Sequence, residues 1–113
     1  MLKLPDAVKI FFCIEPTDMR KSFDGLSGMV VGIVKQSPVS GHLFVFRNKR
    51  GNSMKLLYWD GDGFAIWYKR LEKGTFSIPE TGSDAKIDPR DFAMMLEGVS
   101  FTKVRKRPRY KLA

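Results

Sequence analysis

Three short runs rich in β-branched and aromatic residues follow one another in the middle of the chain, and they constrain the fold more than any other feature. They occupy residues 42–47, 54–59 and 64–71, and glycine-containing turns at residues 48–52 and 60–63 separate them. Such runs favour β-strands, and connections this short join strands that run in opposite directions. The sequence therefore predicts a meander of three antiparallel strands.

The segment before the meander predicts one more strand and one long helix. Residues 8–14 are apolar and β-branched, which is typical of a strand. After a break at residues 15–18, apolar residues recur at spacings of three and four, which predicts one buried helical face: Met19, Phe23, Leu26, Val30, Ile33 and Val34. The helix should end before Ser37–Pro38, because proline disfavours helical geometry in the residue before it.

This predicted helix contains three glycines, Gly25, Gly28 and Gly32. Each costs about 1 kcal/mol relative to alanine within a helix, so their presence needs an explanation. Glycines three and four apart form a smooth strip that another backbone can approach closely. We expect this strip to pack on the sheet, with contact between two copies of the chain as the alternative.

The region after the meander predicts two smaller elements. Residues 75–78 are expected to form a short edge strand. Asp88–Pro89 is a typical helix start, and Gly98 is a plausible end for that helix. The predicted fold class is α+β, with an antiparallel sheet of four to five strands, one long helix packed on it and a short C-terminal helix.

Basic residues are concentrated near the C-terminus. The chain has 20 Lys and Arg against 12 Asp and Glu, a net charge of +8, and six of these cations follow residue 102 with no acid among them. We expect a single domain at residues 1–102 and a basic, disordered tail at 103–113. A tail that is merely solvated is the alternative to one that binds a polyanion.

Basic residues also flank the first hairpin and the end of the third predicted strand, next to aromatic residues. Phosphates accept contacts from Lys and Arg, and bases can stack on aromatic rings, so DNA is the predicted partner. The candidate contacts are Arg47, Lys49, Arg50, Lys55, Lys69, Arg70, Lys103, Arg105, Lys106, Arg107, Arg109 and Lys111. We expect substitutions at Arg47 and Arg50 to change stability little, because loop-end cations add little to a fold.

The residues do not predict an enzyme, a cofactor or a metal site. Asp60 and Asp62 fit a turn better than a calcium loop, because the glutamate that such a loop needs is missing. His42 and Cys13 are single residues of their kinds, so they predict neither a paired metal motif nor a disulfide. No apolar run approaches the ~20 residues that span a bilayer, and a cytosolic protein is expected.

Several segments resemble one known family. They are residues 16–26, 40–51, 55–60, 62–64 and 67–72. In this order they resemble the TnpB accessory proteins of the insertion-sequence sixty-six family of bacterial transposons, over about residues 5–80. These differ from the far longer RNA-guided nucleases that share the name TnpB.

The resemblance implies a role in transposition beside a transposase encoded by the same element. Together with the charge pattern, it predicts a non-catalytic accessory factor that binds DNA and acts with that transposase. The alternative is a subunit that contacts the transposase and has little affinity for DNA. A homodimer remains open.

Overall fold

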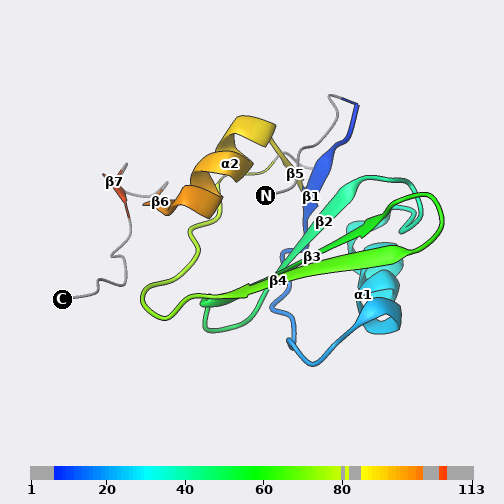
Figure 1. Cartoon of the computed structure of the whole chain (residues 1–113), viewed down its shortest axis with the longest axis horizontal. Coiled ribbons are helices and arrows are strands. Elements are labelled where there is room, and N and C mark those ends of the chain that lie inside the picture. The colour runs from blue at the N-terminus through cyan, green and yellow to red at the C-terminus, as the bar shows by residue number, and fades with distance from the viewer. Residues whose placement is uncertain (1–6, 80, 82–84, 101–104, 107–113) are drawn as a thin grey trace.

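A five-stranded sheet forms the centre of the molecule (Figure 1). The computed structural model describes residues 7–79, 81, 85–100 and 105–106. The strands are β1 (Ile10–Phe12), β2 (Leu43–Arg47), β3 (Ser53–Trp59), β4 (Phe64–Arg70) and β5 (Lys86–Ile87). Their order across the sheet is β4-β3-β2-β1-β5.

The predicted meander is confirmed. β2, β3 and β4 are neighbours and antiparallel, and Val45 lies opposite Leu56, which in turn lies opposite Trp67. Short loops connect these strands because their hydrogen-bonding edges are already adjacent.

The prediction of an antiparallel sheet is wrong for one pair of strands. β1 runs parallel to β2, with Ile10 opposite Leu43. Parallel neighbours need a crossover connection, and the helical segment between the two strands provides it. The remaining strand also differs from the prediction. β5 pairs with the other edge of β1, whereas residues 75–78 form no strand.

The predicted long helix is much shorter in the structure. It consists of α1 (Phe23–Met29) and a single π-helical stretch, η1 (Val30–Val34), and it ends at Lys35 in a left-handed conformation. Residues 17–22 are not helical: Thr17 N donates to the carbonyl of Arg47 at the end of β2, and Lys21 N donates to that of Asp18 in a turn before α1. The first of these bonds draws the chain along the end of the sheet before the helix begins.

The sheet is covered on both faces, which explains why its strands are apolar on both sides. Phe44 and Phe46 belong to a core with α1 and η1, whereas Leu43 and Val45 belong to a second core with α2 (Pro89–Glu97). All four side chains are 0% exposed. The two helices lie on opposite sides of the sheet in Figure 1, so the fold has three layers.

The second core also includes a side chain from residues 75–78, the segment that was expected to form an edge strand. Phe76 is 1% exposed and packs beneath α2 with Phe92 and Met95. This segment therefore contributes a core side chain rather than a strand.

The start and end of α2 match the prediction. The Asp88 side chain accepts a hydrogen bond from the backbone N–H of Arg90 at 2.8 Å, Pro89 is the first helical residue, and Gly98 ends the helix with a φ of 94°. Beyond it, β6 (Val99–Ser100) pairs with β7 (Arg105–Lys106). The other residues of the predicted tail lie outside the described residues, so a domain boundary at residue 102 stays a prediction.

The glycines of the helix do not pack on the sheet, so that expectation is wrong. Gly28 and Gly32 are exposed, and a Cβ atom built on either would have no neighbouring atom within 4 Å. The helix instead buries Leu26, Val30 and Val34 against the sheet. The glycines therefore lie on its outer side.

Gly28→Leu tests this arrangement. We expect an unchanged or higher free energy of unfolding, by up to about 1 kcal/mol, because leucine favours the helix and a Cβ atom at this position has no neighbour within 4 Å. Leu26→Ala, on the buried side of the same helix, should lower it by about 2–5 kcal/mol. Urea denaturation measures both, and a destabilised Gly28→Leu variant would contradict the exposed placement.

His42 bridges the two parallel strands at the start of β2. Its Nδ1 accepts a hydrogen bond from Lys9 N at 3.0 Å, and its ring packs edge-on against Phe11. An accepting Nδ1 requires the neutral form. Burial, and secondly the charge of Lys9, lower the pKa of His42 below its ordinary value of 6.5.

The lowered pKa of His42 predicts a pH dependence of stability. The unfolded chain binds this proton more readily than the folded one, so the free energy of unfolding should fall as pH drops below about 6.5. In His42→Gln the slope between pH 7.5 and 5.5 should be shallower, as followed by thermal melts at ~0.5-unit steps. Equal slopes in the two proteins would show that His42 does not couple protonation to folding.

Candidate nucleic-acid interface

The loop between β2 and β3 is held by its own side chains. Asn48 Oδ1 accepts a hydrogen bond from Ser53 N at 3.0 Å, and Asn48 Nδ2 donates to Asn52 Oδ1 at 2.8 Å. Lys49 and Arg50 lie between these anchors and are exposed. Because the loop backbone is fixed, it holds both cations at a defined place on the end of the sheet.

The chain that follows β4 is tied to the same loop. Leu71 N donates to the carbonyl of Asn52 at 2.7 Å, and Phe76 N donates to that of Gly51 at 2.8 Å. Gly51 has a φ of 78°, a left-handed conformation that favours glycine. Segments about 20 residues apart in sequence are thereby joined at one end of the sheet.

The last residues of β4 bring two more cations to this end. Lys69 lies opposite Met54 and Arg70 lies opposite Ser53, at the start of β3. Neighbouring residues of a strand point to opposite faces, so these two side chains diverge on either side of the sheet. We define the basic end of the sheet as the exposed cations Lys49, Arg50, Lys69, Arg70 and Lys73.

Two of the acidic residues next to the strands lie at the opposite end of the sheet from these cations. Asp60 and Asp62 belong to the turn between β3 and β4, where Asp60 N donates to the carbonyl of Gly63. The seven residues of β3 separate this turn from the basic end, a distance of about 20 Å at ~3.4 Å per residue. Over about two Debye lengths in physiological salt, the acids screen the cations little.

Glu72 is the acid nearest in sequence to the basic end. Its Oε1 lies 4.0 Å from Arg70 Nη2, and both side chains are 66% exposed. Such an exposed pair is weak, so Arg70 remains available to another anion.

Lys55 is a predicted contact residue, but the structure uses its charge internally. The residue is 8% exposed, its Nζ donates to the carbonyl of Lys21 at 2.8 Å, and it lies 4.9 Å from the centre of the Tyr68 ring. We therefore leave Lys55 out of the proposed interface.

Arg47 also has internal partners. Its Nη1 donates to the carbonyl of Phe76 at 2.8 Å, and its guanidinium lies 6.0 Å from the centre of the Phe12 ring. Burial lowers its pKa, although an arginine remains charged at neutral pH. We expected substitution of Arg47 to change stability little, but these contacts give it a structural role. It holds the segment that contains Phe76.

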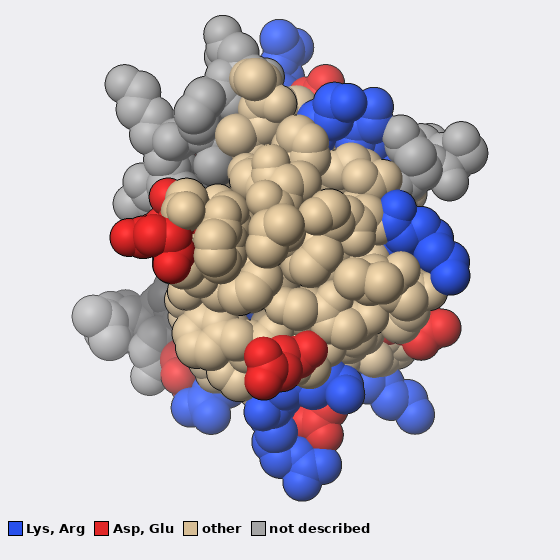
Figure 2. Space-filling view, turned by 90° about the vertical axis from the view of Figure 1, so that its right-hand side faces the viewer, with Lys and Arg blue, Asp and Glu red and all other residues tan. Residues whose placement is uncertain are grey.

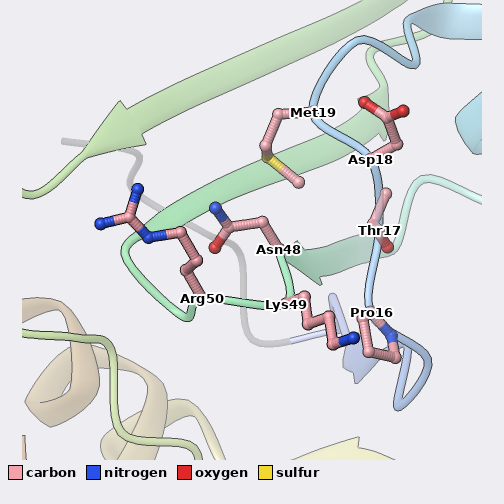
Figure 3. Close-up of a pocket in the computed structure, with 7 residues that line it drawn as sticks. All are labelled: Pro16, Thr17, Asp18, Met19, Asn48, Lys49 and Arg50. Carbon is pink, nitrogen blue, oxygen red and sulfur yellow. The ribbon is translucent and has the colours of Figure 1, made fainter.

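A shallow groove of about 450 Å³ opens between the β2–β3 loop and residues 16–19. Figure 3 shows Lys49 extending toward Pro16 along the groove and Arg50 pointing away on the other side. The carboxylate of Asp18 turns away from both. Among the residues that the structure describes, neither Lys49 nor Arg50 forms an ion pair.

Asp18 is occupied by its neighbour Arg20. The two side chains form a bidentate contact with a shortest distance of 2.6 Å. Hydrogen bonds from Arg20 lower the pKa of Asp18 to about 2, so its carboxylate is ionised throughout the physiological range. This pair adds little net charge to the groove.

Two of the aromatic residues near the basic end differ in exposure. Tyr68 is 52% exposed and shares a face of β4 with Arg70, so one side of its ring could stack on a base. Trp67 is half-buried and lines a small hollow against α2. Of these two aromatic residues, Tyr68 is therefore the one that we expect to stack on a base.

The predicted contacts in the tail are six basic residues. Arg105 and Lys106 form β7, whereas Lys103, Arg107, Arg109 and Lys111 lie outside the described residues. All six stay predictions.

The described residues contain no group of three or more His, Cys, Asp or Glu side chains that could hold a metal ion. Within the same residues, no helix is long and apolar enough to cross a membrane.

Cys13 is 1% exposed in the core beneath α1, and burial raises the pKa of its thiol.

Comparison with known proteins identifies the family. A family model described as IS66 Orf2 like protein matches residues 8–106, a span that contains the whole sheet, both helices and the basic end. The chain belongs to this family. The predicted family is confirmed, and the match extends well beyond residue 80. Membership implies an accessory role in the transposition of insertion sequences.

Two curated relatives come from Sinorhizobium fredii (strain NBRC 101917 / NGR234). The uncharacterized protein y4jC is 32% identical over 102 residues, which cover 89% of this chain and 87% of the relative. The uncharacterized protein y4hO is 33% identical over 102 residues, which cover 89% of each chain. No solved structure matches the chain significantly.

Arg47 and Arg50 should differ in their effect on stability, although they are three residues apart. Arg47→Met should lower the free energy of unfolding by about 1–3 kcal/mol, because it removes a charged hydrogen bond to a part-buried carbonyl. Arg50→Met should change it by no more than about 0.5 kcal/mol, because Arg50 is exposed. Chemical denaturation measures the free energy of unfolding of both variants. Equal effects would show that Arg47 does not stabilise the fold by holding the segment that contains Phe76.

Proposed function

We propose that this protein is a non-catalytic accessory factor of insertion-sequence transposition that binds the DNA backbone through the basic end of the sheet. The observation that carries this proposal is the gathering of five exposed cations from two separate loops and a strand at one end of the fold. The family supports the process, and the charge arrangement supports the ligand.

The geometry of the basic end suits a phosphate backbone. Lys49 and Arg50 project from a loop whose backbone is fixed, while Lys69 and Arg70 lie on opposite faces of the adjacent strand. Cations spread over an edge in this way can contact successive phosphates. Such contacts set the position and orientation of a protein on DNA and carry little sequence information.

The tail adds to this interaction in the proposal. Its six cations supply a second cluster of charge, and each phosphate neutralised releases counterions. In this scheme the protein binds DNA with little sequence preference. The separately encoded transposase supplies the chemistry and the recognition of element ends, and this protein helps to assemble it there.

The slope of log affinity against log salt concentration tests the basic end directly. Replacing Lys49 and Arg50 with Gln should flatten this slope by about 2, because each phosphate contact contributes about 0.9 on duplex DNA. The matched control is Lys9→Gln with Arg90→Gln. It removes the same charge from exposed positions near the opposite end of the sheet and should leave the slope almost unchanged.

Fluorescence anisotropy on duplex and single-stranded DNA, between about 50 and 300 mM salt, provides these slopes. Equal flattening by the two pairs would show that the basic end is not the contact surface. If the full chain binds no DNA at low salt, either alone or with its transposase, DNA binding is wrong. A subunit that contacts only the transposase then takes its place.

A further inference from the structure

The outer side of the helical segment α1–η1 carries a strip of small and apolar residues with one charge at each end. From start to end, its exposed residues are Asp24, Gly28, Val31, Gly32 and Lys35. Val31 is 56% exposed, and a Cβ atom built on either glycine would meet no other side chain or segment within 4 Å. Nothing within the described chain covers this strip.

The middle of the face that carries the strip is uncharged. Figure 2 shows the side of the molecule that carries α1 and the β3–β4 turn, and its centre has no Lys, Arg, Asp or Glu, whereas charged side chains lie around its margin. Phe23, the first residue of α1, is 45% exposed, and Val39, which follows the helical segment, is 52% exposed. Exposed apolar side chains beside an uncharged surface are typical of a contact with another protein.

We propose that a second copy of this chain docks on this strip, with the two helical segments antiparallel about a two-fold axis. The strip is complementary to itself in that arrangement. Asp24 of one copy faces Lys35 of the other, and Gly28 of one faces Val31 of the other. Both pairings are centred on the same point, between Met29 and Val30, so one axis satisfies them together.

Shape and charge act together in this contact. The Val31 side chain of one copy occupies the space above Gly28 of the other, which lets the two backbones approach closely. Two Asp24–Lys35 pairs close the ends and disfavour a parallel arrangement, in which like charges would meet. The basic end of the sheet takes no part, since it shares no residue with the strip.

The size of the strip indicates a reversible dimer. Helical segments of this length bury less surface than the ~1,200 Å² of a stable interface, so we expect dissociation in the micromolar range. Sedimentation velocity on the full chain over a dilution series should therefore show a monomer–dimer equilibrium.

Charge exchange provides a sharp test of the pairing. Asp24→Lys alone places two positive charges opposite each other at both ends of the dimer, and Lys35→Asp alone places two negative charges there. Each variant should weaken self-association by about tenfold or more. An equimolar mixture of the two variants should restore it, because each contact then joins opposite charges.

Two further variants complete the experiment. Gly28→Leu fills the space meant for Val31 and should abolish association while the thermal melt is retained. Arg90→Asp changes net charge by as much as Lys35→Asp, but lies at the start of α2 and should leave association unchanged. A wild-type chain that stays monomeric, single variants that associate normally, or a mixture that does not recover would each overturn the proposal.

Discussion

The burial of β2 on both faces is the constraint on which the rest of the fold depends. Its alternate side chains, Phe44 and Phe46 on one side and Leu43 and Val45 on the other, are completely removed from water. A strand of this kind needs a covering layer on each face. The crossover from β1 to β2 supplies α1 and η1 for one face, and α2 supplies the other after the chain has passed around the sheet.

The same topology decides where charge gathers. The carboxyl ends of β1, β2 and β4 and the start of β3 meet at one end of the sheet, so loops that are distant in sequence become neighbours there. Lys49 and Arg50 face solvent because their loop is held from behind. Arg47 and Lys55, only a few residues away, point into the protein and hold the surrounding segments in place.

Two surfaces of different character result. The basic end suits a polyanion, whereas the outer side of α1 and η1 is uncharged except at its ends. They share no residue. The two proposals therefore concern different parts of the molecule, DNA at the basic end and a second copy of the chain at the helical segment.

The sequence alone determined the elements whose signals are local. Short turns and β-rich runs specify the meander, Asp88–Pro89 and Gly98 specify α2, and the matching motifs specify the family. Tertiary structure decided the parallel β1–β2 pairing and the short length of the helix. It also decided on which side of the helix the glycines lie and where the side chain of each cation points. A strand's partner, or the face onto which a side chain turns, depends on contacts between residues far apart in the chain, and local patterns do not contain them.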